Sequence, residues 1–269
     1  MWDRNLGLNR KITKVISENL NDTNSEIYKE ISDISGEYTE SNDIAKMIEG
    51  NRDSITSFVN EDITELGDYA FKDCVNLEYV YLPNCTKLGN ECFQNCTSLK
   101  TLLLPNVTEI ANSSHYLDGL SNLEVIDLSS YDSNTFNRQF AYYNGISIIF
   151  NQSKISKLRI LSYGIDGLSD GGGAFGWNDL EILVLPNLSY LGHSAGFTAE
   201  NIIIPNTCVW NAGSAHLNGT LYVNDELIDE YRLTDGHSWG YKYDRGEILP
   251  ISQLPQEIRE ELELCQIQI

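Results

Sequence analysis

Leu77-Glu78-Tyr79-Val80-Tyr81-Leu82-Pro83-Asn84 is the stretch that decides the fold of this chain of 269 residues, because the chain repeats it. The pattern returns 22 residues later, from Leu99 to Asn106, and again from Leu180 to Asn187. Self-similarity at a period of roughly 20 to 30 residues is typical of a solenoid, whose turns bury their apolar faces against one another. We therefore expect stacked turns that present a long surface rather than a deep catalytic pocket.

Each copy of the pattern predicts one short strand. Leucine, isoleucine and valine at alternate positions favour a strand with one face inward, and Pro-Asn ends it. Aligned on Val80, the inward positions are Phe58, Leu102, Ile126, Leu158, Leu183, Ile202 and Leu221. From Val80 onward their intervals are 22, 24, 32, 25, 19 and 19 residues, so the irregularity falls in the middle of the array. Insertions in a solenoid map to loops on one flank, and such loops often bind partners.

The sequence predicts three parts. Residues 1–54 carry apolar residues at spacings of three and four, which predicts amphipathic helices that attach the chain to a particle or to copies of itself. Residues 55–223 hold the repeats. Residues 224–269 are expected to form a C-terminal cap and tail, because the last turn would otherwise expose its apolar cross-section.

The charge and hydropathy exclude several classes of partner. With 39 acidic and 18 basic residues, the net charge is −21. Nucleic acids and anionic membranes require clustered Lys and Arg, so neither is expected as a partner. No stretch approaches the roughly 20 apolar residues of a membrane span, which argues against membrane insertion. The start of the chain lacks the apolar run and cleavage site of a signal peptide, so export by the general secretion route is not expected.

The six cysteines predict buried thiols rather than disulfides or a metal site. Cys74 and Cys96 are 22 residues apart, which is the repeat spacing, and Cys92 takes the position of Ala70 in the aligned copy. A cysteine that exchanges with a small apolar residue acts as a core filler. The pair Cys92 and Cys96 lacks the second pair of ligands that a zinc site needs.

No pattern in the sequence indicates catalysis. The four histidines are scattered over different repeats, and HExxH, GxSxG and a phosphate-binding glycine loop are missing. Acidic pairs near the C-terminus lack a second carboxylate at the separation of roughly 5 to 9 Å that glycosidases use. We therefore expect no enzyme, no cofactor and no metal.

The outer face of the predicted sheet is unusually apolar. Residues that flank the inward positions point outward, and a contiguous apolar patch usually marks an interface. Two covers are equally compatible with the sequence: the N-terminal helices of the same chain, or another subunit. The predicted interface residues are Tyr79, Tyr81, Leu103, Val125, Ile182, Val184, Ile203 and Tyr222, and the same alignment places Lys157 and Arg159 on this face.

Aromatic residues in and beside the long middle intervals are candidate receptor or glycan contacts. Tyrosine and tryptophan supply a large contact area at small entropic cost, and they stack on sugar rings. The candidates are Tyr131, Tyr142, Tyr143, Tyr163 and Trp177.

The arm from Ile63 to Cys74, Ile-Thr-Glu-Leu-Gly-Asp-Tyr-Ala-Phe-Lys-Asp-Cys, leads into the strand pattern Leu-x-x-Val-x-Leu-Pro-Asn. This combination resembles the BspA-like leucine-rich repeat family of bacterial surface proteins and of phage and prophage tail or virion proteins. The resemblance covers roughly residues 55–225, and the Ala-Phe arm is lost after the second repeat. It implies a leucine-rich-repeat solenoid, α/β to mainly β, with a short-stranded parallel sheet, an N-terminal helical segment and a C-terminal cap.

The same resemblance implies adhesion to surfaces and no catalytic residues. The phrase from Ser41 to Gly50 is also similar to one that precedes the variable domain of phage structural proteins. We therefore expect a virion-associated protein that forms a homo-oligomer or binds virion components through residues 1–54 and binds a host surface protein or glycan. The alternatives are a bacterial cell-surface adhesin and a structural decoration protein without a ligand. The expected location is the virion, the extracellular space or the cell surface.

Overall fold

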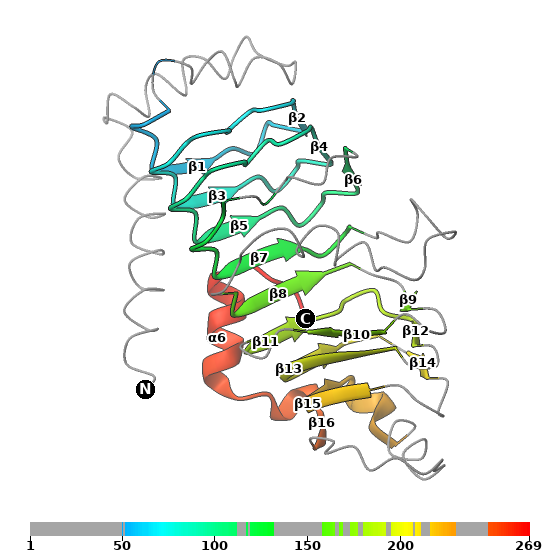
Figure 1. Cartoon of the computed structure of the whole chain (residues 1–269). Helices are drawn as coiled ribbons and strands as arrows, with labels where there is room; N and C mark the ends of the chain where they lie inside the picture. The colour runs from blue at the N-terminus through cyan, green and yellow to red at the C-terminus, as the bar shows by residue number, and fades with distance from the viewer. Residues whose placement is uncertain are drawn as a thin grey trace.

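The protein is a parallel β-solenoid whose turns stack along one axis (Figure 1). The structure is a computed structural model of the whole chain. It describes residues 50, 52–111, 117, 119–131, 158–164, 167–168, 173–176, 180–191, 195–206, 208–210, 216–229 and 247–269. The predicted N-terminal helices lie outside these ranges.

The main sheet contains ten strands of the described residues, and every pairing in it is parallel. Its order is β1-β3-β5-β7-β8-β11-β13-β15-β16, with β10 beside β13. The strands are β1 (Ser57–Val59), β3 (Tyr79–Tyr81), β5 (Thr101–Leu103), β7 (Val125–Leu128), β8 (Ile160–Tyr163), β10 (Gly173–Gly176), β11 (Ile182–Val184), β13 (Ala195–Ile204), β15 (His216–Val223) and β16 (Ile248–Pro250). Each turn of the solenoid thus adds one strand, as the repeat predicts.

The segments that lead from one strand of the main sheet to the next are called the return arms. In the described part of the chain they carry two smaller parallel sheets. One consists of β2 (Glu65–Leu66), β4 (Lys87–Leu88) and β6 (Glu109–Ile110), and the other of β9 (Gly167–Leu168), β12 (Tyr190–Leu191) and β14 (Val209–Trp210). Among the described residues, β15 is followed by the 3₁₀ turns η3 (Asp225–Leu227) and η4 (Ile251–Gln253) and by helix α6 (Gln256–Leu264).

The strand register agrees with the sequence alignment except at β8. Ile126 pairs with Leu161, three residues beyond the expected Leu158. Leu158 instead takes the place of the leucine that precedes each strand, as Leu123 does before β7. Leu158 and Leu161 are both buried, so either could be the inward residue of the strand. The long insertion between β7 and β8 has no sequence feature that distinguishes the two alignments. The interval from Leu161 to the next inward residue, Leu183, is then 22 residues, the spacing of the first turns.

The inward side chains form one continuous core between the main sheet and the return arms. Its first turns hold an aromatic stack, in which Phe71 packs edge-on against Phe58 at 4.8 Å between ring centroids and parallel to Phe93 at 5.5 Å. All six cysteines are free and buried, which confirms the prediction of buried thiols; five of them lie in this core, and Cys265 lies on the outer face of the sheet. Burial raises the pKa of the Cys74 and Cys85 thiols to about 11, so neither is a reactive thiolate at neutral pH.

The asparagine of the repeated Pro-Asn pair forms a hydrogen bond between neighbouring turns. The side-chain amide of Asn84 donates to the carbonyl of Glu61 at 2.7 Å, and that of Asn106 donates to the carbonyl of Pro83 at 2.7 Å. Each asparagine therefore satisfies a carbonyl of the preceding turn at the point where the strand ladder stops. In these turns the Pro-Asn pair thus links each turn to the one before it.

Adjacent arms pack closely against each other at Gly89. A Cβ atom at this position would lie 2.4 Å from the backbone nitrogen of Asp68 and 2.4 Å from the carbonyl carbon of Gly67. We expect Gly89→Ala to lower the free energy of unfolding by about 1–3 kcal/mol, because backbone atoms must shift to admit the methyl group. Urea denaturation followed by circular dichroism measures this. Gly50→Ala, where no atom lies within 4 Å, is the matched control and should stay near the wild-type value. If both variants were equally stable, the backbone at Gly89 could not lie as close to Gly67 and Asp68 as the structure shows.

Candidate functional site: the outer sheet face and its cover

The outer face of the main sheet is a continuous apolar surface, separate from the core. The alternation of inward and outward side chains is as predicted, since the outward residues form a second cluster of their own. From the sheet, this cluster contains Tyr79, Leu103, Val125, Ile160, Ile182, Val184, Ile203 and Tyr222, with Val59, Tyr81 and Leu249 partly buried against it. The binding role of these residues stays a prediction.

The outward residues of β8 differ from the expected ones. Ile160 and Ser162 occupy this face, in register with Val125 and Asp127. The alignment that placed Lys157 and Arg159 here is wrong, because β8 begins later in the sequence than predicted. Arg159 precedes the strand, and Lys157 lies outside the described residues.

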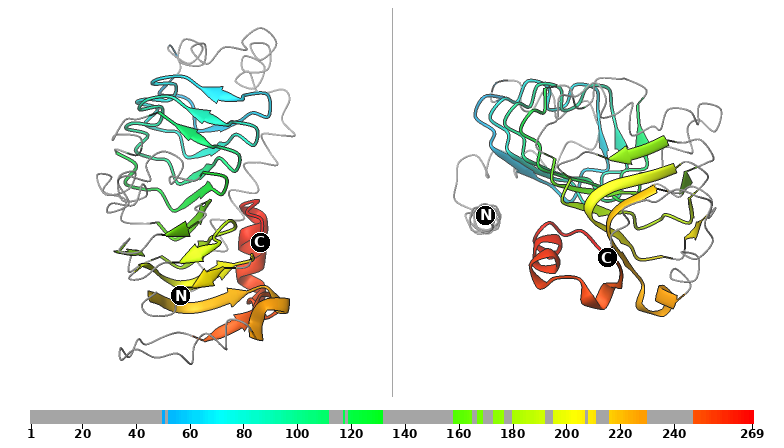
Figure 2. Two further views of the ribbon diagram at one scale, coloured as in Figure 1. Left: turned by 90° about the vertical axis from the view of Figure 1, so that its right-hand side faces the viewer. Right: turned by 60° about the horizontal axis from the view of Figure 1, so that its bottom comes forward.

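The chain's own C-terminal segment, residues 248–269, covers this face, and we call it the C-terminal strap. After β16 joins β15, the strap turns through η4 and runs back as α6 on the side of the sheet opposite the return arms (Figure 2). Five of its side chains are buried in the outer cluster: Leu254, Ile258, Leu262, Cys265 and Ile267. The sequence predicted either the N-terminal helices or another subunit as the cover, so the strap is a third solution. Its signal in the sequence was the four-residue spacing of Leu254, Ile258 and Leu262.

The residues directly before the strands form a charged column across the sheet. In register, Glu78, Lys100, Glu124, Arg159 and Glu181 follow one another with alternating sign. Lys100 pairs with Glu78 at 2.7 Å and Arg159 with Glu181 at 2.8 Å. This alternation places opposite charges on neighbouring strands of the sheet.

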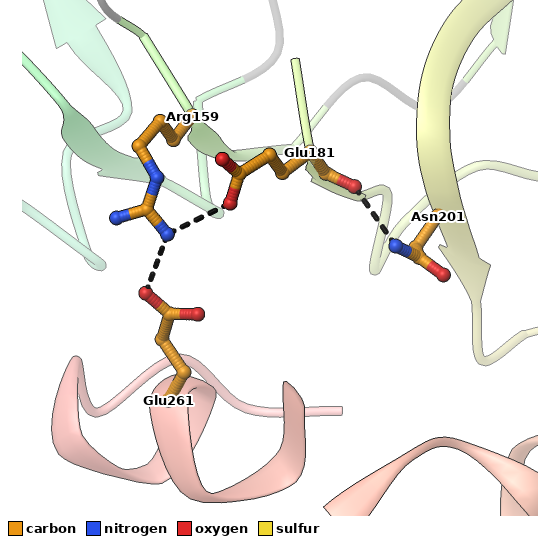
Figure 3. A network of polar contacts seen from close by, with 4 residues as sticks. All are labelled: Arg159, Glu181, Asn201 and Glu261. Atoms are coloured by element: carbon orange, nitrogen blue, oxygen red, sulfur yellow. Dashed lines mark hydrogen bonds and ion pairs between the residues drawn. The ribbon is translucent and has the colours of Figure 1, made fainter. Parts of the chain in front are cut away.

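Arg159 also holds the strap (Figure 3). Its Nη2 donates to Glu181 Oε2 and to Glu261 Oε1 of α6, each at 2.8 Å. Glu261 is only 8% exposed, so the contact lies inside the interface. Burial lowers the pKa of Arg159, but the hydrogen bonds and charges of the two carboxylates outweigh it and raise the pKa overall. The guanidinium therefore stays charged and ties the strap to the middle of the array.

Asp127 is a carboxylate buried on the same face. It is 2% exposed, and the backbone N–H of Ser129 donates to its Oδ1 at 3.0 Å. Burial raises its pKa to about 6, and the hydrogen bond from Ser129 opposes that shift. None of the ion pairs within the described ranges includes Asp127.

Of the aromatic residues predicted to contact a receptor or glycan, two pack in or against the core and three lie outside the described residues. Tyr163 ends β8 in register with Leu128, and its side chain is completely buried in the core. Tyr131 packs edge-on against it at 6.1 Å between ring centroids and is partly buried. Tyr163 therefore offers no surface to a receptor, and its prediction as a contact is wrong because β8 extends to this residue. Tyr142, Tyr143 and Trp177 lie outside the described residues.

Two kinds of site are missing from the part of the chain that the structure describes. No three His, Cys, Asp or Glu side chains there gather closely enough to hold a metal ion. Within the same residues, no helix has the length and apolar composition to cross a membrane.

Comparison with known proteins identifies the repeats. The sequence model of the BspA type leucine rich repeat region matches six copies within residues 51–165, which include β1 to β8. No curated protein and no solved structure matches the chain. Solenoids of this kind generally serve as scaffolds for protein interaction rather than as catalysts. Residues 51–165 are thus a BspA-type leucine-rich repeat region, the family that the arm and strand patterns resemble.

Proposed function

We propose that this chain is a non-enzymatic, virion-associated protein of a phage or prophage, whose repeats adhere to a protein or glycan of the host surface. The BspA-type repeat array carries the proposal, because stacked turns present a long surface to a partner. In this proposal residues 1–54 attach the chain to virion components or to other copies of itself, and the protein acts as a homo-oligomer.

The adhesive contact is proposed for the flank that carries the middle insertions rather than for the sheet face. The strap buries Ile182, Ile203 and Tyr222, so a partner would have to displace it before reaching them. The intervals after β7 and β8 carry Tyr142, Tyr143 and Trp177, which suit the recognition of sugars or of a protein surface.

An adsorption experiment tests this function. We expect the purified, fluorescently labelled chain to bind cells of the host bacterium and to compete with intact particles for them. Tyr142→Ala/Tyr143→Ala should weaken adsorption at least about tenfold, because loss of an aromatic anchor typically costs 2 kcal/mol or more at an interface.

The matched control is Tyr69→Ala, a tyrosine on a return arm that is 46% exposed. It should adsorb like the wild type. The adhesin proposal fails if the wild-type chain neither binds cells nor competes with particles. If only Tyr69→Ala loses adsorption, the contact lies on the arms instead of the insertions.

Binding without competition would favour the second candidate, a bacterial cell-surface adhesin. The family match favours this candidate too, because BspA-type repeats are typical of surface-associated proteins.

A further inference from the structure

Asp127 is buried close to Cys265 of the strap, and no ion pair among the described residues includes it. The groups that face it come from several elements: Ser129 beyond the end of β7, Ser162 of β8, Tyr81 of β3 and Cys265 of the strap. None of these carries a positive charge. Arg159, the cation of the strap contact, is bonded to Glu181 and Glu261. An ionised Asp127 under the closed strap is therefore stabilised by hydrogen bonds alone.

Other polar atoms on this face also lack partners. The hydroxyls of Tyr79 and Thr101 and the Nε of Arg159 are buried without a hydrogen bond. The Tyr79 hydroxyl lies near the thiol of Cys265 in the strap. Buried polar atoms without partners cost free energy that water would recover if the face were opened. The buried polar groups under the strap therefore partly offset the free energy gained by burying its apolar side chains. The core differs, because leucine is its most frequent residue.

We propose that the C-terminal strap is a pH-responsive closure of the outer sheet face, held most tightly when Asp127 is protonated and loosened when Asp127 ionises. The inference concerns the strap itself and does not depend on the proposed adhesion. Opening exposes the apolar row that includes Val184 and Ile203, so the pH of the medium controls access to that row.

The direction follows from linkage between protonation and closure. Burial raises the pKa of Asp127 from its ordinary value of 3.8 to about 6, so the closed state binds the proton more tightly than an open state in which water solvates the carboxylate. Closure is fully favoured below the ordinary value and weakens as the pH rises through about 6. Between about pH 5 and pH 8 these two pKa values correspond to a roughly tenfold fall in the closing equilibrium constant.

Hydrogen exchange of the full chain, followed by mass spectrometry at pH 5 and pH 8, measures this directly. Rates are divided by the intrinsic chemical exchange rate at each pH. We expect peptides from residues 256–267 to lose about tenfold in protection at the higher pH, while peptides from β3 and β5 keep theirs. Asp127→Asn should remove the pH dependence. Asp127→Leu should do the same, and its side chain matches the neighbouring Leu103 if the amide variant folds poorly.

Glu261→Gln is the matched control on the strap. It weakens the contact with Arg159, so protection should fall by a similar factor at both pH values and keep its tenfold pH dependence. Strap protection that does not change with pH overturns the proposal. So does an unchanged pH dependence in both Asp127 variants, and so does a parallel loss of protection in all peptides, which would mean that the whole array opens.

Discussion

Arg159→Met is expected to lower the free energy of unfolding by about 3 kcal/mol, because it removes the cation shared by Glu181 and the buried Glu261. The methionine replaces the apolar stem of the arginine and omits the guanidinium, so the main loss is that of the charge and its hydrogen bonds. Urea denaturation of the full chain followed by circular dichroism gives the value. The strap should also lose protection in hydrogen exchange, since Glu261 belongs to α6.

The charged column supplies a matched control for this experiment. Lys100→Met removes the same kind of charge, but the Lys100 and Glu78 side chains are 32% and 53% exposed, whereas those of Arg159 and Glu261 are 14% and 11% exposed. Exposed pairs contribute about 0–1 kcal/mol, so Lys100→Met should be nearly silent. Adding Glu261→Gln to Arg159→Met should recover part of the loss, because the second change removes the stranded charge. Equal effects of Arg159→Met and Lys100→Met would rule out a buried anchor.

Phe93→Ala should have the largest effect on the array itself, a loss of about 3–5 kcal/mol in the free energy of unfolding. Phe93 is 1% exposed and stacks on Phe71, so its removal leaves a cavity between two turns. Rigid neighbours of the parallel sheet and the arms cannot collapse into that space without breaking the ladder. Chemical denaturation at constant pH provides the measurement.

A double-mutant cycle tests whether the stack acts as a unit. Phe71→Ala combined with Phe93→Ala should cost less than the two single changes added together, by about 0.5–1.5 kcal/mol, because the rings contact each other. Val75→Ala, an exposed apolar position on an arm, should stay within about 0.5 kcal/mol of the wild type. Full additivity of the two phenylalanine changes would show that the turns are energetically independent at this point.

Local patterns in the sequence were sufficient to predict the solenoid. The strand phrase around Val80 predicts the parallel sheet, its alternation predicts the two faces, and the repeat position of Cys74 and Cys96 predicts buried thiols. These features are decided within one turn of the chain or between adjacent turns. The predicted register of β8 is wrong because a long insertion separates Ile126 from its partner Leu161, so the repeat spacing no longer locates the strand.

The cover of the sheet could not be predicted in the same way. Arg159 and Glu261 are 102 residues apart, and a single ion pair at that separation leaves no pattern in either segment. The apolar stripe of α6 shows that the helix needs a partner, but not which surface supplies it. Tyr163 illustrates the same limit, since its burial depends on a register that only the folded sheet defines.

The position of the strap also has a consequence for biosynthesis. The turns from β1 to β7 contact mainly their neighbours along the chain, so they can form while the rest is still being translated. Residues 248–269 follow every strand that they cover, so the apolar face stays open until the ribosome has produced them. A nascent chain arrested after β15 would present that face to other chains and would be prone to aggregate. The strap thus closes the outer face only after the strands beneath it have been synthesised.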